Sequence, residues 1–151
     1  IDLDARAVVA LTRACLLHME RGSRIIEVAS AAAFCPLPYM NVYAASKAFV
    51  LRYTRALRWE LHGSGITITA LCPTWVKTGF EAQARKSGNA RAVNHLFFAQ
   101  NASTVVSRAL FMNRMHAAVA CCSIPSFCLR IIGKIVPNCI TMWGWNLIRR
   151  L

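Results

Sequence analysis

The sequence predicts an α/β fold in which parallel strands lie between helices. Two short apolar segments, residues 25–29 and 66–71, have the composition of buried strands. Segments with one apolar, helix-like face flank them, over residues 3–20, 41–61 and 103–114. Hydrophobic residues make up 56% of the chain, which is more than in an ordinary soluble domain. We expect this excess where strands and helix faces are covered by other parts of a protein.

The first half of the chain alternates between helices and strands. The first helix ends at Gly22-Ser23, and the first strand follows it. A loop with two prolines then leads to a long helix, which Asn41 is expected to cap and which ends near Leu61. Gly63-Ser64-Gly65 stops this helix, and β-branched residues alternate through the strand that comes next.

The second half is expected to begin with a mobile, partly helical flap over residues 80–100. The helix over residues 103–114 comes next, and a last strand occupies residues 117–121. These elements belong to one unit, residues 1–123. Residues 124–151 are expected to form an apolar, basic, helical tail.

Basic and aromatic residues interrupt the apolar tail, a pattern that suits a membrane interface. The same pattern suits a helix that packs over a substrate cleft or against a partner subunit. Pro125 and Pro137 divide the tail, and we favour packing within the protein or between subunits over a membrane surface. No run of eighteen apolar residues occurs, so no membrane-spanning helix is expected.

Tyr43 and Lys47 form a candidate proton-transfer pair. Residues four apart on a helix share one face, so the Lys47 ammonium can lie beside the Tyr43 phenol. A free phenol has a pKa of about 10, and a neighbouring cation lowers that pKa toward neutral pH. Ser30, at the end of the first strand, can donate a hydrogen bond to a substrate oxygen as its charge changes. Together the three residues outline a site for reducing a carbonyl, although a Tyr-x-x-x-Lys pair also occurs by chance on many helices.

The residues around this pair resemble the second half of a short-chain dehydrogenase/reductase. Five segments carry the resemblance, in the family's order and at its separations. The segment that resembles the fifth strand is Arg24-Ile25-Ile26-Glu27-Val28-Ala29-Ser30, and the one that resembles the substrate loop is Ala32-Ala33-Phe34-Cys35-Pro36-Leu37-Pro38. The segment that resembles the catalytic helix is Val42-Tyr43-Ala44-Ala45-Ser46-Lys47-Ala48-Phe49-Val50. The segment that resembles the sixth strand with its turn is Gly65-Ile66-Thr67-Ile68-Thr69-Ala70-Leu71-Cys72-Pro73, and the one that resembles the nicotinamide-contacting segment is Lys77-Thr78-Gly79-Phe80.

The resemblance implies a doubly wound, Rossmann-type parallel sheet, of which this chain carries the last three strands with flanking helices. It implies NAD or NADP as the cofactor. Tyr43 would exchange a proton with the substrate oxygen, Lys47 would lower the tyrosine pKa and hold the nicotinamide ribose, and Ser30 would position the substrate oxygen. Asp4 stands where the family has a relay asparagine. The residues implied to border the nicotinamide are Pro73, Val76 and Thr78.

The loop over residues 31–40 contains the candidates for substrate contact. Phe34, Leu37 and Tyr39 lie in the segment that resembles the substrate loop. A loop packed for stability explains these three side chains equally well.

Several features depart from the family pattern. Asp4, when ionised, accepts a hydrogen bond from water but cannot donate one, so the proton relay is altered. Thr74 replaces the usual glycine, and its side chain is expected to crowd the nicotinamide or strain the turn. The Gly-x-x-x-Gly-x-Gly turn that receives the cofactor pyrophosphate is missing. We therefore expect this chain to be the C-terminal portion of a protein of roughly 250 residues. This portion is expected to be inactive by itself. The alternative is that the protein is truncated in nature.

The predicted function is NAD(P)-dependent interconversion of a carbonyl and an alcohol, on a small or lipid-like substrate, in the full-length protein. The alternative is a catalytically inactive, truncated relative that serves as a binding or assembly module, with the tail as an attachment to membranes. The intact set of Ser30, Tyr43 and Lys47 favours the enzyme, whereas Asp4 and Thr74 favour the module.

Charge and cysteine content limit the other partners. The net charge is +12, but the cations are scattered without interleaved aromatic residues, so no nucleic-acid partner is expected. Seven cysteines without Cys-x-x-Cys spacing predict reduced, mostly buried thiols in a cytoplasmic protein. The four histidines form no ligand motif, so no metal is expected. The resemblance implies a homo-oligomer, with the helix over residues 41–61 among its contacts.

Overall fold

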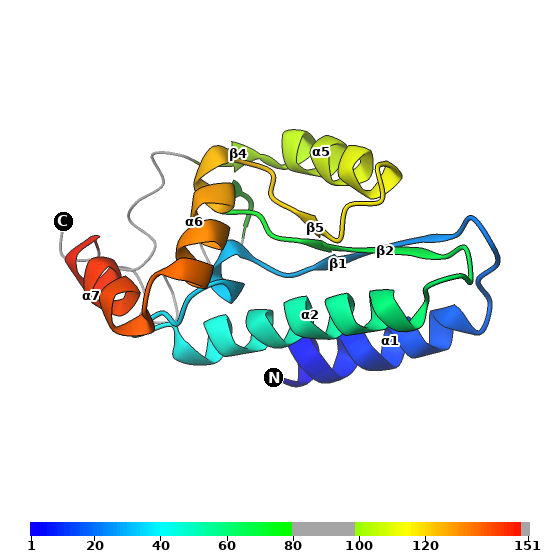
Figure 1. Ribbon diagram of the computed structural model, residues 1–151, viewed down its shortest axis with the longest axis horizontal. Coiled ribbons are helices and arrows are strands. Elements are labelled where there is room, and N and C mark those ends of the chain that lie inside the picture. Colours follow the sequence, from blue (N-terminus) through cyan, green and yellow to red (C-terminus); the bar gives the residue numbers. More distant parts are fainter. Residues whose placement is uncertain (80–98, 149–151) are drawn as a thin grey trace.

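The computed structural model describes residues 1–79 and 99–148 of the 151-residue chain (Figure 1). Its elements, in chain order, are the π-helix η1 (Asp2–Arg6), α1 (Ala7–Leu16), β1 (Arg24–Val28), the 3₁₀ helix η2 (Ala31–Ala33), α2 (Asn41–Glu60), β2 (Thr67–Leu71), β3 (Val76–Lys77), β4 (Gln100–Asn101), α5 (Ala102–Arg114), β5 (Val119–Ala120), α6 (Ile124–Ile135) and α7 (Asn138–Ile148).

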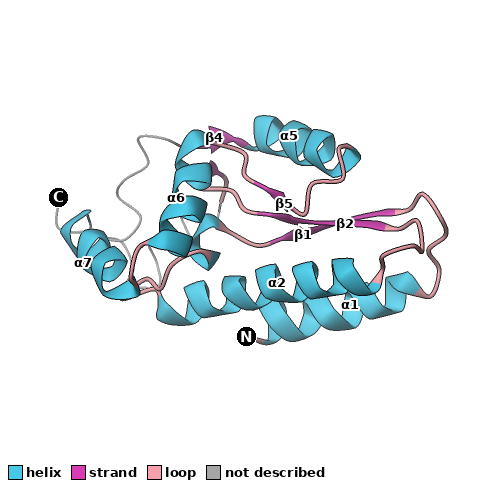
Figure 2. Ribbon diagram, in the orientation of Figure 1, coloured by secondary structure: helices cyan, strands magenta, loops and turns pink. Residues whose placement is uncertain are grey.

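The strands β1, β2 and β5 form a parallel sheet with β2 in the centre. Val28 at the end of β1 lies opposite Leu71 of β2, and Leu71 lies opposite Ala120 of β5. Figure 2 shows α1 and α2 on one face of this sheet and α5 on the other. The arrangement confirms the predicted α/β fold with three parallel strands. A second sheet, in which β3 pairs with β4, was not predicted.

The hydrophobic core lies on both faces of β2, and all five residues of this strand are buried. Helices cover both faces, which explains why the strand is apolar without interruption. The cluster on the α2 side contains Ala29, Val50, Leu51, Ala70, Cys72 and Val119. The cluster on the α5 side contains Leu71, Val105, Ala109, Ala120 and Cys122. This packing fixes where the carboxyl ends of β1 and β2 lie.

A buried amide fastens α5 to the sheet. Asn113 is 2% exposed, and its Nδ2 donates to the carbonyl of Ile25 and to Oγ1 of Thr69, each at 3.0 Å. The two acceptors belong to β1 and β2, so one side chain joins three elements. Because a buried amide costs free energy unless it is hydrogen-bonded, this pairing specifies how α5 sits on the sheet.

Several predicted bounds differ from the structure by one residue, and three differences have a visible cause or concern a cap. The first helix ends at Leu16, not Glu20, because the amides of His18 and Met19 bond three residues back and tighten the chain into a turn. Met40, not Asn41, is the N-cap of α2. The last strand pairs only over Val119–Ala120, because the amide of Ala117 still bonds to Met112 of α5.

The tail contains two helices, α6 and α7, with Pro137 between them. None of the helices within residues 1–79 and 99–148 is both long and apolar enough to cross a membrane. The division of the chain at residue 123 stays a prediction. The flap predicted over residues 80–100 lies outside the described residues, apart from its end at β4.

Candidate active site

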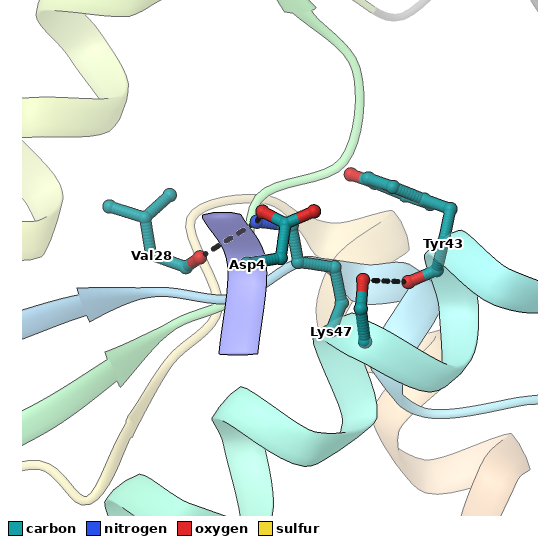
Figure 3. Close-up of polar contacts among 5 residues, drawn as sticks. Asp4, Val28, Tyr43 and Lys47 are labelled. Atoms are coloured by element: carbon teal, nitrogen blue, oxygen red, sulfur yellow. Dashed lines mark hydrogen bonds and ion pairs between the residues drawn. The ribbon is translucent and has the colours of Figure 1, made fainter. Parts of the chain in front are cut away.

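The helix α2 carries Tyr43 and Lys47 one turn apart, near its amino end. Figure 3 shows both side chains extending from the same side of this helix. The Lys47 ammonium nitrogen lies 5.9 Å from the centroid of the Tyr43 ring. The buried residues Val50 and Leu57 hold α2 against the sheet, so the helix presents this pair from a fixed position.

The ammonium of Lys47 joins three elements of the structure. It forms an ion pair with Asp4 of η1 at 2.9 Å and donates to the carbonyl of Val28 in β1 at 3.3 Å (Figure 3). An ammonium has three donors, and within the described residues two acceptors engage them. The side chain of Lys47 is 14% exposed and that of Asp4 is 38% exposed, so the ion pair lies partly out of water.

Ser30 follows β1 directly, two residues after the carbonyl that Lys47 contacts. It is 9% exposed and caps the short helix η2, where its Oγ accepts a hydrogen bond from the amide of Ala32 at 3.1 Å. This contact orients the hydroxyl. Because the hydroxyl accepts here, its proton can be donated to another oxygen.

The residues expected to border a nicotinamide follow β2. The carbonyl of Pro73 accepts from the amide of Ala31 at 2.8 Å, which joins the turn after β2 to the turn after β1. Val76 lies in β3 and packs, half-buried, against the core on the α5 side. Thr78 is exposed and follows β3. The structure therefore brings Ser30 and Pro73 to one edge of the sheet, the carboxyl edge.

The three candidates for substrate contact have different surroundings. Phe34 is half-buried and packs against the core on the α2 side. Leu37 is half-buried, and its carbonyl accepts from the amide of Met40. Tyr39 is 64% exposed and has a positive φ of 67°. The placement of Phe34 agrees with the packed-loop explanation, and the three side chains share no common environment.

The tail helices contact the same edge of the sheet, a relationship that the sequence left open. Oγ of Ser126 in α6 donates to the carbonyl of Cys72 at 2.5 Å. Nε1 of Trp145 in α7 donates to the carbonyl of Pro38 at 3.0 Å. Oγ1 of Thr74 lies 3.2 Å from Oγ of Ser123, the N-cap of α6. The residue that departs from the family glycine thus fastens the turn to the tail.

Two contacts near the site were missed by sequence reasoning. The direct ion pair between Asp4 and Lys47 was not anticipated, although an acid placed at the relay position was a usable signal. The bond from Trp145 to the substrate loop had only the aromatic character of the tail as a signal. Both contacts join residues far apart in sequence, which periodicity does not reveal.

Cysteine thiols lie beneath this edge, and burial keeps them protonated. Burial, the largest cause, and the nearby thiol of Cys121 raise the pKa of Cys72 to about 12. Burial likewise raises the pKa of Cys35, with a smaller opposing effect from a hydrogen bond with Thr141. The structure leaves all seven cysteines unpaired, and Cys128 and Cys139 are exposed, so the prediction of mostly buried thiols is wrong for these two.

The chain is similar in sequence to several known proteins. A family model described as short chain dehydrogenase matches residues 1–89. The chain is 43% identical over 84 residues to the ketoacyl reductase HetN of Nostoc sp., covering 54% of this chain and 29% of the relative. It is 34% identical over 100 residues to sulfoacetaldehyde reductase 2 of Chromohalobacter salexigens, covering 64% of this chain and 39% of the relative. The match thus spans well under half the length of these relatives.

Solved structures share the fold. A short-chain dehydrogenase from Sphingobium yanoikuyae in complex with NADPH superposes with a TM-score of 0.57 at 27% identity. This superposition covers 67% of the present chain and 38% of the other chain.

Proposed function

Because the chain belongs to the short-chain dehydrogenase family, we propose that its full-length protein is an NAD(P)-dependent oxidoreductase. The reaction interconverts a carbonyl and an alcohol on a small or lipid-like substrate. Relatives named as a ketoacyl reductase and a sulfoacetaldehyde reductase support carbonyl reduction. The observation that carries the proposal is the Lys47 ammonium, 5.9 Å from the Tyr43 ring on the helix that faces the end of β1.

The side chains of this chain have separate tasks in the proposed reaction. The Tyr43 phenol gives a proton to the substrate oxygen in reduction and takes it back in oxidation. The Ser30 hydroxyl, oriented by the amide of Ala32, donates a hydrogen bond to the same oxygen as negative charge develops on it. The Lys47 ammonium, 5.9 Å from the centroid of the Tyr43 ring, supplies a positive charge beside the phenol.

The donor set around Lys47 fits a nicotinamide cofactor. Its ammonium has three donors, and Asp4 and the Val28 carbonyl engage two within the described residues. The third donor suits a ribose hydroxyl. Pro73, Val76 and Thr78 would border the nicotinamide, which supplies or accepts the hydride when bound. The NADPH complex of the Sphingobium relative supports this choice of cofactor.

An inactive binding or assembly module remains the second candidate. The observation that favours it is the ion pair itself, because the Asp4 carboxylate neutralises part of the charge that Lys47 would use. Thr74 adds to this, because its hydroxyl lies at the turn where the family has a glycine and is joined to the tail through Ser123. A homo-oligomer that uses α1 and α2 is compatible with either candidate.

The test is an assay of the full-length protein with both nicotinamide cofactors and a panel of aldehydes, ketones and ketoacyl thioesters. We expect oxidation of the reduced cofactor that depends on the carbonyl compound. The 151-residue chain alone is expected to be inactive. Cofactor binding by the full-length protein without turnover on any member of the panel would favour the module.

A further inference from the structure

The helix α6 turns its small residues toward the protein and its large apolar residues outward. Ser126 is fully buried, and the backbone at Gly133 lies against the carbonyl of Phe34. Ile124 is 81% exposed and Ile135 is 75% exposed, at opposite ends of the helix. Between them, exposed apolar side chains continue the outward face: Phe127, Ile131 and Ile132. The contacts of α6 with the sheet therefore leave most of its apolar surface in solvent.

The helix α7 has the same character. Trp145 is half-buried and donates to the loop at Pro38, whereas Trp143 is 69% exposed. Ile140, Leu147 and Ile148 are exposed as well. Figure 1 shows α7 beyond α6, at the end of the molecule farthest from the turn that joins α1 to β1. We call the exposed apolar residues of α6 and α7 the tail surface.

The tail surface lies in the basic part of the chain. Residues 82–151 contain no aspartate or glutamate. They contain nine basic residues: Arg85, Lys86, Arg91, Arg108, Arg114, Arg130, Lys134, Arg149 and Arg150. Lys134 is exposed next to Ile135, so positive charge directly borders the apolar residues.

Charge distinguishes between the occupants that such a surface can have. Exposed apolar side chains gathered on two successive helices are unfavourable in water and indicate an interaction site. A second copy would bring two positively charged tails together, which is opposed by repulsion between like charges. An anionic lipid surface offers an apolar phase and negative charge at once. Tryptophan is enriched at this boundary because its ring is apolar and its N–H is polar.

From these observations we propose that the tail surface docks onto an anionic membrane surface. The helices α6 and α7 have 12 and 11 residues, too short to span a bilayer, so they lie in the interface. The sequence alone favours packing within the protein or between subunits. The structure shows packing through Ser126, Gly133 and Trp145. Ile124, Ile135 and Trp143 remain largely exposed outside this packing.

Vesicle sedimentation tests the proposal, with vesicles of phosphatidylcholine alone or of phosphatidylcholine and phosphatidylserine in equal amounts. The 151-residue chain and the full-length protein are both expected to sediment with the anionic vesicles, less so at high salt. Ile135→Glu and, as a second variant, Trp143→Glu are expected to weaken this binding about tenfold or more. Trp59→Glu is the matched control, because Trp59 is 81% exposed on α2 and the charge change is the same.

Three outcomes would overturn the proposal. The first is equal sedimentation of Ile135→Glu and unchanged protein. The second is a dimer, detected by light scattering, that Ile135→Glu dissociates while neither form binds vesicles; the occupant would then be a second copy. The third is binding by the 151-residue chain but not by the full-length protein, which would mean that preceding residues cover the tail surface.

Discussion

The ammonium nitrogen of Lys47 lies 2.9 Å from Oδ1 of Asp4, and the same nitrogen lies 5.9 Å from the centroid of the Tyr43 ring. A carboxylate from η1 thus contacts the cation that the proposed mechanism assigns to the tyrosine. The strand β1 also packs on α2, and the carbonyl of its Val28 accepts a hydrogen bond from this cation. The carboxylate of Glu27, in the same strand, accepts a hydrogen bond from the hydroxyl of Thr12. Asp4 is therefore the charged group that distinguishes this site from one with a neutral relay residue.

Asp4→Asn is expected to lower the stability of the full-length protein. It replaces the ion pair at 2.9 Å by a weaker neutral acceptor, and because the Asp4 side chain is 38% exposed, the loss should be at most about 1 kcal/mol. Urea unfolding of both proteins measures this difference in free energy.

Asp2→Asn is the control for that measurement, since Asp2 is an exposed acid in the same element η1. It removes the same charge without touching the ion pair, and its stability should match that of the unchanged protein. Equal stability of Asp4→Asn and the unchanged protein would show that the ion pair between Asp4 and Lys47 contributes nothing to the fold.

Tyr43→Phe is expected to lower kcat of the full-length protein by about a hundredfold to ten thousandfold, the usual contribution of a positioned acid–base group. The ring and its packing are retained, so cofactor binding should change little. Tyr53→Phe removes a hydroxyl from another ring of the same helix, retains the stacking of that ring with Phe49, and should leave turnover near normal. Near-normal turnover in Tyr43→Phe would mean that another group transfers the proton.

Gly133→Ala is expected to destabilise the protein. A β-carbon at this position would collide with the carbonyl oxygen of Phe34, and it would lie 3.1 Å from Sγ of Cys35. The clash should push α6 away from the substrate loop at a cost of about 1–3 kcal/mol. Urea unfolding of the two proteins gives this difference in free energy.

Gly144→Ala is the comparison for the Gly133 variant, because it makes the same change in the neighbouring helix α7. Among the described residues, nothing lies within 4 Å of a β-carbon placed at Gly144. Alanine has the higher helix propensity, so this variant should be neutral or slightly more stable. Equal stability of the two variants would mean that α6 does not approach the loop closely.

The buried thiol of Cys72 is expected to make stability fall at alkaline pH. Its pKa is raised from 9.0 to about 12, chiefly by burial, so the folded state retains a proton that the unfolded state loses. Between pH 9.0 and about 12, the unfolded state therefore binds fewer protons than the folded state. The free energy of unfolding decreases as the pH rises through this range, by at most about 1.4 kcal/mol per pH unit. Below pH 9 the thiol is protonated in both states and contributes no slope.

Urea unfolding at several pH values between 8 and 11 measures this effect in the unchanged protein and in Cys72→Ala. Substitution removes the thiol, so the variant should be less stable at pH 8 but lose stability less steeply above pH 9. Parallel pH dependence of the two proteins would mean that the thiol ionises as easily in the folded state as in the unfolded one.

The fold class, and the elements on which the candidate site residues lie, could be predicted from the sequence. The strand ending before Ser30, the four-residue spacing of Tyr43 and Lys47, and the strand before Pro73 are local patterns. Such patterns follow from the periods of helices and strands, so no tertiary information is needed to read them. The exact ends of the helices were less predictable. Hydrogen bonds within turns, such as that from the amide of His18 to the carbonyl of Cys15, decide where a helix ends.

The pairing between distant elements was decided by the tertiary structure. The sequence predicts a relay role for Asp4, and only the approach of η1 to α2 shows that Asp4 also forms an ion pair with Lys47. The sequence shows that the tail is apolar. The contacts of Ser126 with Cys72 and of Gly133 with Phe34 decide which residues of the tail are buried. Small residues allow that close approach, and the larger side chains are left outside. The sequence by itself therefore determined the elements and their chemistry, whereas packing determined which charges meet and which apolar surfaces stay exposed.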